Sequence, residues 1–258
     1  MHKLRLMPLA PNYPVMLRTT DGVRLDGAHT PAGPGGSDVG IVLAHGFTGS
    51  WRCADTRRIT HVLSRYGGVV AFDFRGHGRS GGRTTVGDLE VHDVAAAVRH
   101  ARSIGYEKVA VVGFSMGAAV AIRYAALHRG ADAVVAVSGP ARWYYRDTPP
   151  MRRVHWAIER PLGRIAARIA RRTRISSGRW DPAPMPPHEA AALVAPVPLL
   201  VVHGDADTFF PVEHAHQIFA GAKEPKELWI EPGYGHAESA ARPGMIVRIG
   251  AWIEANLS

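Results

Sequence analysis

The stretch Gly113-Phe114-Ser115-Met116-Gly117 decides how this sequence is interpreted. It has the form G-x-S-x-G, and the β-branched apolar run at 108–112 before it predicts a buried strand. The run at 118–125 after it has the pattern of a helix. A serine on a sharp strand-to-helix turn points outward, and its hydroxyl lies at a helix N-terminus, where free N–H groups favour negative charge. The motif therefore predicts a nucleophile that attacks an acyl carbon.

Similar apolar runs recur along the chain and alternate with helical patterns. The predicted strands lie at 40–44, 69–72, 108–112, 133–137, 199–202 and 227–230, and the predicted helices at about 57–66, 86–103, 116–128, 212–220 and 245–256. Continuous apolar runs are typical of strands covered on both faces, so we expect an α/β fold with a mostly parallel sheet between two helical layers. Two further segments flank Asp21-Gly22, which predicts an antiparallel hairpin at one edge of the sheet.

One region interrupts this alternation. About sixty residues between the predicted strands ending near 138 and beginning near 198 show no strand pattern and contain many prolines and aromatic residues. We expect a single domain over 1–258 with an insertion at about 141–190, here called the cap, that folds over one edge of the sheet. Pro161 and Gly163 are predicted to divide the cap into two helices.

Composition excludes several classes of protein. No run approaches the ~20 apolar residues that a membrane span needs, so no transmembrane segment is expected. Arg5 and Pro8 interrupt the N-terminal region, which argues against a signal peptide and favours a cytoplasmic location. Cys53 is the only cysteine, so no internal disulfide can form. The net charge is +9, but no zinc-ligand spacing or RNA-binding aromatic cluster accompanies it, and no nucleic-acid partner is expected.

Chemically versatile residues follow the predicted strands. The Ser115 turn follows one strand, Asp205 and Asp207 follow the strand at 199–202, and His236 follows the last strand. The carboxyl ends of parallel strands meet at one edge of a sheet, where functional residues gather. Serine, aspartate and histidine in this chain order are the components of a hydrolase triad.

Five motifs on these strands resemble the α/β-hydrolase superfamily, with serine esterases and lipases that carry a helical cap as the nearest type. They are H-G-F-T-G at 45–49, D-F-R-G-H-G-R-S at 73–80, G-F-S-M-G at 113–117, G-D-A-D-x-x-x-P at 204–211 and G-Y-G-H at 233–236. The resemblance covers nearly the whole chain outside the cap, and it implies the α/β-hydrolase fold with an eight-stranded, mostly parallel sheet.

The resemblance also implies residue roles. Ser115 is the expected nucleophile, His236 its base and Asp207 the acid that orients the base, with the backbone N–H groups of Phe47 and Met116 as the oxyanion hole. Asp205 lies two residues from Asp207 and reaches the same loop, but the spacing G-x-x-D favours Asp207.

The other histidines are expected to be structural. His45 and His77 are predicted to brace loops by hydrogen bonds. His203, His214 and His216 share no reliable ligand spacing with a carboxylate, so no metal and no cofactor are expected.

The expected reaction is hydrolysis of a carboxylic ester through an acyl-enzyme. Phe209-Phe210 favours a narrowed pocket and hence a short-to-medium acyl or monoacyl ester as the small-molecule substrate. Two alternatives stay open, a thioesterase acting on acyl-CoA or acyl-carrier substrates and a binding protein that has lost catalysis. The predicted pocket walls, each of which is also compatible with ordinary core, are Phe114, Trp143, Tyr144, Phe209 and Phe210.

The cap carries most of the positive charge. Residues 141–190 contain eleven arginines and no lysine against four acidic residues, a local excess of seven positive charges. Leu162, Ile165 and Ile169 fall on one face of a predicted helix and arginines on another. Three interpretations are open. The apolar face packs on the sheet edge with the basic face in solvent, the arginines face an anionic donor or an acidic carrier protein, or the cap contacts anionic lipid.

Overall fold

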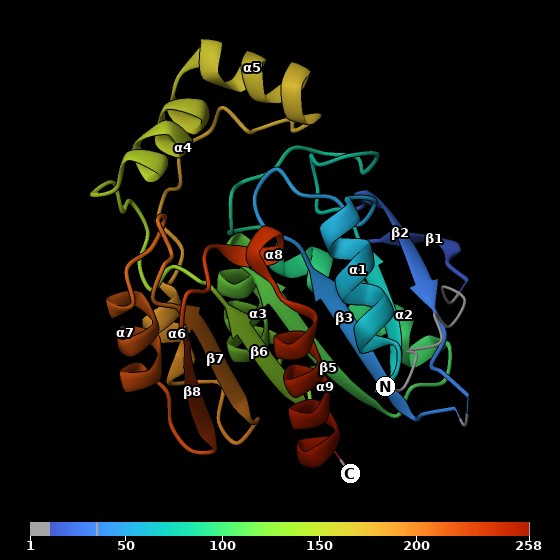
Figure 1. Cartoon of the computed structure of the whole chain (residues 1–258). Coiled ribbons are helices and arrows are strands. Elements are labelled where there is room, and N and C mark those ends of the chain that lie inside the picture. The colour runs from blue at the N-terminus through green and yellow to red at the C-terminus, as the bar shows by residue number, and fades with distance from the viewer. Residues whose placement is uncertain (1–10, 35, 258) are drawn as a thin grey trace, which may run out of the picture.

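An eight-stranded sheet runs through the molecule in the computed structural model, which describes residues 11–34 and 36–257 (Figure 1). The N-terminal residues 1–8, for which the sequence predicts no signal peptide, lie outside the described residues. The strands are β1 Tyr13–Arg18, β2 Arg24–Thr30, β3 Val39–Ala44, β4 Gly68–Phe72, β5 Lys108–Phe114, β6 Ala133–Val137, β7 Leu199–Gly204 and β8 Lys226–Glu231.

The strand order confirms the predicted topology. It is β1-β2-β4-β3-β5-β6-β7-β8, and every pair from β4 to β8 is parallel. β1 and β2 form the antiparallel hairpin at one edge, and the turn between them contains Asp21-Gly22 as predicted. Because β3 to β8 run parallel, their carboxyl ends meet at a single edge of the sheet.

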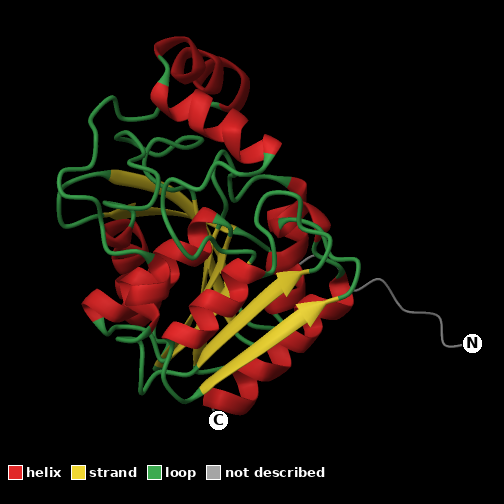
Figure 2. Cartoon of the chain, turned by 90° about the vertical axis from the view of Figure 1, so that its left-hand side faces the viewer, coloured by secondary structure: helices red, strands yellow, loops and turns green. Residues whose placement is uncertain are grey.

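Helices cover both faces of the sheet (Figures 1 and 2). They are α1 Ala54–Leu63, α2 Val91–Ser103, α3 Met116–His128, α4 Pro149–Glu159, α5 Pro161–Arg171, α6 Pro187–Ala191, α7 Glu213–Gly221, α8 Ala237–Ala240 and α9 Pro243–Leu257. Residues of α2, α3, α6 and α7 enter one hydrophobic core, and residues of α1, α8 and α9 enter a second core on the opposite face. The fully buried, β-branched composition of the central strands follows from this double coverage.

The alternation of side chains along β5 corrects one pocket prediction. Val109 and Val111 enter the first core, whereas Ala110, Val112 and Phe114 enter the second. Successive side chains of a strand point to opposite faces, so Phe114 is committed to the same core as Val112. Its side chain is fully buried and does not line the pocket beside Ser115. The prediction of Phe114 as a pocket wall is therefore wrong.

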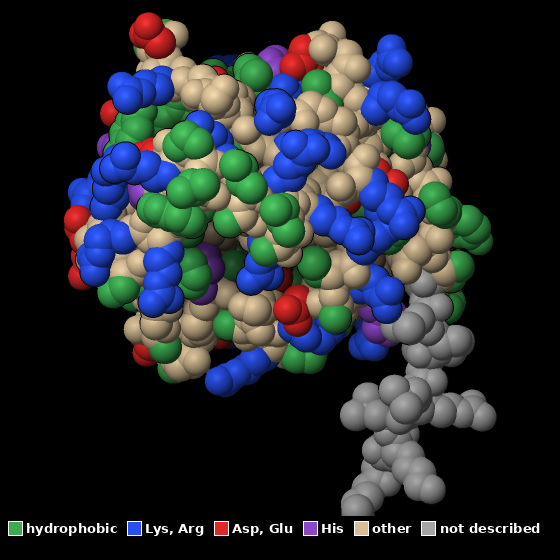
Figure 3. All heavy atoms as spheres, turned by 90° about the horizontal axis from the view of Figure 1, so that it is seen from above, with side chains coloured by type: hydrophobic (Ala, Val, Ile, Leu, Met, Phe, Trp, Pro, Cys, Tyr) green, Lys and Arg blue, Asp and Glu red, His purple; other side chains and the backbone are tan. Residues whose placement is uncertain are grey.

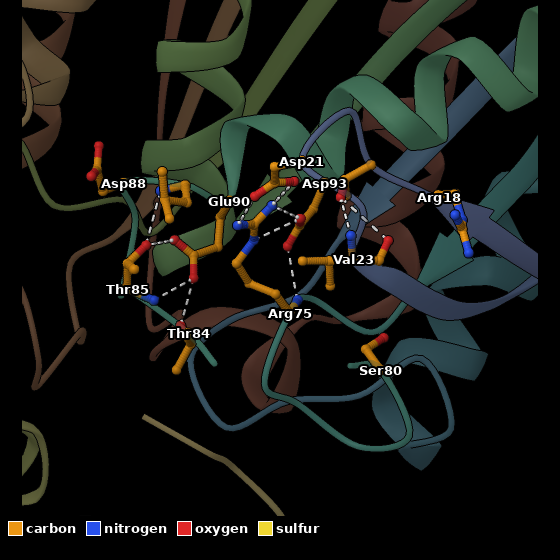
Figure 4. A network of polar contacts seen from close by, with 12 residues as sticks. Arg18, Asp21, Val23, Arg75, Ser80, Thr84, Thr85, Asp88, Glu90 and Asp93 are labelled. Atoms are coloured by element: carbon orange, nitrogen blue, oxygen red, sulfur yellow. Dashed lines mark hydrogen bonds and ion pairs between the residues drawn. The ribbon is translucent and has the colours of Figure 1, made fainter. Parts of the chain in front are cut away.

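The start of α2 also differs from the prediction, because residues 84–90 form a loop. Val86 and Gly87 both have positive φ values, which a right-handed helix does not allow. The buried carboxylate of Glu90 accepts hydrogen bonds from Thr84, Thr85 and Gly87, as the network in Figure 4 shows. The helix consequently begins at Val91, five residues after the predicted start.

A buried arginine joins this loop region to the edge hairpin. Arg75 lies 2.7 Å from Asp21 of the hairpin turn and 2.8 Å from Asp93 of α2 (Figure 4). The hydrogen bond from Arg75 lowers the pKa of Asp21 to about 2. The arginine of the D-F-R-G-H-G-R-S motif is thus a structural residue that ties β1, β2 and α2 to the loop after β4.

The helices α4 and α5, here called the cap hairpin, stand over the carboxyl ends of the strands (Figures 1 and 2). Their boundary at Arg160–Pro161 matches the predicted division of the cap. Helix α4 has no buried residue, and Gly163 and Ala167 are the buried residues of α5. A Cβ atom at Gly163 would lie 2.4 Å from the backbone oxygen of Trp156, so this glycine permits the close contact between the two helices.

This contact overturns one interpretation of the cap. Leu162, Ile165 and Ile169 are 72%, 53% and 78% exposed, so they do not pack on the sheet edge. Gly163 contacts α4 and Ala167, one turn later, is buried as well, so helical geometry turns the larger apolar side chains outward. The amphipathic pattern was predicted correctly, but its apolar face points to solvent.

Candidate active site

The turn at Ser115 has a backbone shape that explains its two glycines. Ser115 adopts φ 52° and ψ −116°, a strained conformation for a residue with a side chain. A Cβ at Gly113 would lie 2.2 Å from the oxygen of Gly117, and a Cβ at Gly117 would lie 2.2 Å from the oxygen of Ala44. Glycine is required at both positions, and the tight turn places the Ser115 side chain at the N-terminus of α3.

Ser115, His236 and Asp207 form a continuous chain of hydrogen bonds. The Nε2 atom of His236 lies 2.9 Å from Ser115 Oγ, and its Nδ1 atom lies 2.8 Å from Asp207 Oδ2. The Asp207 side chain is fully buried, whereas that of His236 is 15% exposed. A carboxylate acceptor at Nδ1 fixes the tautomer in which Nε2 can accept the proton of Ser115.

Backbone donors hold the Asp207 carboxylate in place. Its Oδ1 atom accepts hydrogen bonds from the N–H groups of Phe209 and Phe210, at 2.8 and 3.1 Å. Asp205 has a different position, because its exposed carboxylate accepts a hydrogen bond from Gly233 N at 2.6 Å. Asp205 thus tethers the loop that leads to His236, and the geometry brings Asp207 rather than Asp205 to the imidazole.

A second histidine lies beneath Asp207. His203 is fully buried at the end of β7, where its Nε2 donates to the backbone oxygen of Phe210 at 2.8 Å and lies 3.6 Å from Asp207 Oδ2. Burial lowers its pKa, so the neutral form is favoured. His203 thus ties the end of β7 to Phe210, three residues after Asp207. The one signal of this contact in the sequence is the position of His203 directly before the G-D-A-D motif.

Two backbone N–H groups are predicted to form the oxyanion hole. Those of Phe47 and Met116 have no hydrogen-bond acceptor among the described residues, and both residues line the pocket. The neighbouring N–H of Gly46 donates to Glu238 Oε1 at 2.6 Å. The Glu238 carboxylate therefore ties the loop after β3 to α8, directly after His236. Sequence analysis missed this residue, and its spacing of two residues from His236 is the signal that was available.

His45 and His77 brace the loops around the site. The Nδ1 atom of His45 donates to Gly46 O at 2.7 Å, and its Nε2 accepts from Phe74 N at 3.1 Å. The Nδ1 atom of His77 donates to Arg75 O at 3.0 Å, and burial lowers the pKa of His77 to about 3. Both rings are fully buried and hydrogen-bonded to loop backbone, in agreement with the predicted structural role.

A pocket of about 1360 Å³ lies between the cap hairpin and the carboxyl ends of the strands. Ser115 and His236 line its floor, and both helices of the cap hairpin line its roof. Four of the predicted aromatic residues, Trp143, Tyr144, Phe209 and Phe210, lie on its walls. The Phe209 ring stacks on the His236 ring with centroids 4.2 Å apart, which places an apolar surface directly beside the imidazole.

Comparisons with known proteins agree with this geometry. A model of the alpha/beta hydrolase family matches residues 41–247. This chain belongs to the alpha/beta hydrolase family. A monoacylglycerol lipase of Mycolicibacterium smegmatis is 31% identical over 234 residues, which cover 76% of this hydrolase and 80% of the lipase. An uncharacterised protein of Escherichia coli O157:H7, YfhR, is 28% identical over 224 residues, covering 85% and 71% of the two chains.

A solved structure shows the same architecture. The esterase Pf2001 of Pyrococcus furiosus superposes on this hydrolase with a TM-score of 0.74 at 27% identity, covering 95% of this chain and 93% of the esterase. Together with the family match, this similarity identifies a hydrolase of the esterase-like type. Over residues 11–34 and 36–257, no helix of the hydrolase is long and apolar enough to cross a membrane. The cytoplasmic location stays a prediction.

The arginines of this hydrolase's cap divide into two groups. Arg164 donates to the backbone oxygens of Ile158 and Glu159, at 3.0 and 3.1 Å, and so satisfies carbonyls of the last turn of α4. Arg153 and Arg171 also line the pocket, but their guanidinium groups form no ion pair with another described residue. Arg164 is therefore a structural residue of the cap hairpin, a role that the charge pattern alone did not show.

Proposed function

We propose that this protein is a serine hydrolase that cleaves carboxylic esters through an acyl-enzyme. The observation that carries the proposal is the unbroken chain Asp207–His236–Ser115, which opens into a large pocket beside two N–H groups without acceptors. A serine alone is a weak nucleophile, and a hydrogen-bonded base that is itself oriented by a carboxylate supplies the missing activation.

In the first half of the proposed reaction, Ser115 Oγ attacks the ester carbonyl carbon. His236 Nε2 accepts the hydroxyl proton, and the buried Asp207 carboxylate stabilises the imidazolium that forms. The developing oxyanion is placed beside the N–H groups of Phe47 and Met116. Each such donor typically contributes about 3–4 kcal/mol of barrier lowering.

The second half of the reaction reverses these roles. His236 returns the proton to the leaving alkoxide, and the alcohol departs while the acyl group stays on Ser115. Water then attacks the acyl carbon and His236 accepts its proton. When the second tetrahedral intermediate collapses, the bond to Ser115 Oγ breaks, His236 returns the proton to that oxygen, and the carboxylic acid leaves. No step of this proposed reaction requires a metal ion or an organic cofactor.

Short-to-medium acyl or monoacyl esters are the proposed substrates. The stacked Phe209 and the buried Phe210 present flat apolar walls next to the imidazole, which suits one acyl chain. The similarity to a monoacylglycerol lipase supports the same class. A thioesterase that acts on acyl-CoA or acyl-carrier substrates is the second candidate, favoured by the exposed Arg153 and Arg171 in the pocket lining.

A substrate series tests the proposal. Nitrophenyl esters from acetyl to palmitoyl should be hydrolysed with kcat/KM highest for short-to-medium chains, and acyl-CoA of matched length should be a poorer substrate. Ser115→Ala, which retains the turn and the pocket, is the control for background hydrolysis. Turnover of acyl-CoA above that of every ester would favour the thioesterase, and absence of turnover on all substrates would contradict the proposed hydrolysis.

A further inference from the structure

The outer face of α5 carries an apolar stripe that no part of the described chain covers. Leu162, Ile165 and Ile169 lie on successive turns of the helix, and each is more than half exposed. The other side of α5 is already occupied, since Gly163 packs against α4 and Ala167 is buried in the pocket lining. A helix of this pattern in water ordinarily turns its apolar stripe to the core. Here the stripe is left available to a partner.

The charges around the stripe are all of one sign. Residues 160–172 contain five arginines and no acidic residue. Arg168 and Arg172, each three positions after an isoleucine of the stripe, are exposed, and their guanidinium groups form no ion pair with other described residues. Figure 3 looks down on this side of the molecule and shows hydrophobic side chains surrounded by many basic ones. A surface that combines exposed apolar side chains with unpaired arginines favours a partner that has both apolar and anionic groups.

We propose that the outer face of α5 docks on an anionic lipid bilayer. The three aliphatic side chains would enter the boundary between headgroups and acyl chains, and the flanking arginines would bind lipid phosphates. A second copy of the chain suits this face poorly, because a symmetric contact would place two caps of excess positive charge against each other.

Docking in this orientation has a consequence for the pocket. Gly163, Ala167 and Ala170 of α5 line the pocket roof, while the stripe lies on the outer side of the same helix. The bilayer surface would therefore lie one helix diameter, roughly 10 Å, from the pocket. The docking itself does not depend on the proposed ester hydrolysis, because it rests only on the outer face of the cap.

Co-sedimentation with vesicles tests the docking with the full chain. Wild type should bind vesicles of equal parts phosphatidylglycerol and phosphatidylcholine, and not vesicles of phosphatidylcholine alone. The variant Leu162→Ser/Ile165→Ser/Ile169→Ser keeps every charge, and its partition coefficient should fall about tenfold or more because apolar insertion is lost. A matched control, Met16→Ser/Leu127→Ser/Leu193→Ser, alters three exposed apolar residues elsewhere and should bind like wild type.

A charge variant gives an independent test that leaves the stripe intact. Arg168→Gln should weaken binding to the anionic vesicles about fivefold, and increasing salt should weaken binding by wild type. Melting temperatures equal to that of wild type show that the variants are folded. If the triple variant is unfolded, the vesicle binding of Arg168→Gln alone tests the proposal. Three results would overturn the proposal: no binding of wild type to anionic vesicles, equal binding of wild type and the stripe variant, or a wild-type dimer that the stripe variant abolishes.

Discussion

The carboxyl edge of the sheet and the cap hairpin are built in opposite ways. Asp207 is fully buried, its two oxygens accept hydrogen bonds from defined donors, and the Ser115 turn is fixed by glycines that no other residue can replace. The cap hairpin instead has no buried residue in α4 and two small ones in α5. One region holds atoms in a fixed geometry, and the other is held mainly by its own helix–helix contact.

The difference shows how the molecule separates two tasks. Proton transfer requires distances held near 2.8 Å, so its residues lie on strand ends supported by two hydrophobic cores. Contact with a variable substrate or a bilayer tolerates a looser element that can adapt. We therefore expect changes at the sheet edge to act on kcat and changes in the cap hairpin to act on binding.

Removal of the nucleophile should have the largest effect. Ser115→Ala should lower kcat on a nitrophenyl ester on the order of 10⁶-fold, because the attacking oxygen is lost while the fold persists. Steady-state rates and circular dichroism measure the two parts of this prediction. Most of the activity remaining in a folded Ser115→Ala variant would exclude Ser115 as the nucleophile.

The two neighbouring aspartates provide the next test. Asp207→Asn should lower kcat on the order of 10³–10⁴-fold, since the amide favours the wrong imidazole tautomer. Asp205→Asn is the matched control and should cost far less, because Asp205 contacts the Gly233 backbone and not His236. The reverse ranking of the two variants would transfer the acid role to Asp205.

Glu238 should have an intermediate effect as a positioning residue. Glu238→Ala removes the acceptor for Gly46 N and should lower kcat about tenfold, less than the 10²–10³-fold expected when an oxyanion donor itself is lost. Glu238→Gln keeps an acceptor oxygen and should recover most of the activity with KM unchanged. Equal losses in both variants would show that the charge, not the hydrogen bond, matters.

The pH dependence of stability should report His214, which packs beside the Asp207 loop. Burial lowers the pKa of His214 to about 4, and its Nδ1 accepts a hydrogen bond from Ala141 N. Between pH 6.5 and about 4 the unfolded chain binds the proton and the folded chain does not, so the free energy of unfolding falls as pH falls.

Urea unfolding at pH 7 and pH 5 measures this contribution. From pH 7 to pH 5, the free energy of unfolding of wild type should fall by about 1–2 kcal/mol more than that of His214→Asn. The asparagine amide oxygen can replace the Nδ1 acceptor but does not titrate. Parallel pH dependence of the two proteins would show that His214 is not the group responsible.

Within the cap hairpin, Arg164→Ala should have the smallest effect on catalysis. The variant loses the hydrogen bonds to Ile158 and Glu159, and amide exchange in α4 and α5 should accelerate about fivefold, as expected for a lost contact worth about 1 kcal/mol. Turnover of nitrophenyl acetate should stay near the wild-type value. A large loss of kcat on this small ester would contradict the separation of the two regions.

The sequence predicted the sheet edge better than the cap, for a physical reason. Central strands buried on both faces leave continuous apolar runs, and the tight turn at Ser115 demands glycines, so both features appear directly in the sequence. The orientation of α5 depends instead on which side of an amphipathic helix finds a neighbour. The contact of Gly163 with α4 sets the orientation of α5. The hydrophobic periodicity of the sequence does not show which side of the helix makes such a contact.

Residues that act through long-range contacts were also beyond the sequence. Glu238, for example, contacts Gly46 across 192 positions of the chain. Phe114 shows the converse, because the alternation of side chains along β5 is enough to place it in the same core as Ala110 and Val112.

Labelling with a fluorophosphonate tests the central claim most directly, because this probe reacts only with a serine that is activated by a working base and oxyanion hole. We expect stoichiometric labelling, located on the Ser115 peptide by mass spectrometry, absent in Ser115→Ala and strongly slowed in Asp207→Asn. A folded wild-type protein that stays unlabelled, or that carries the label on another serine, would contradict it.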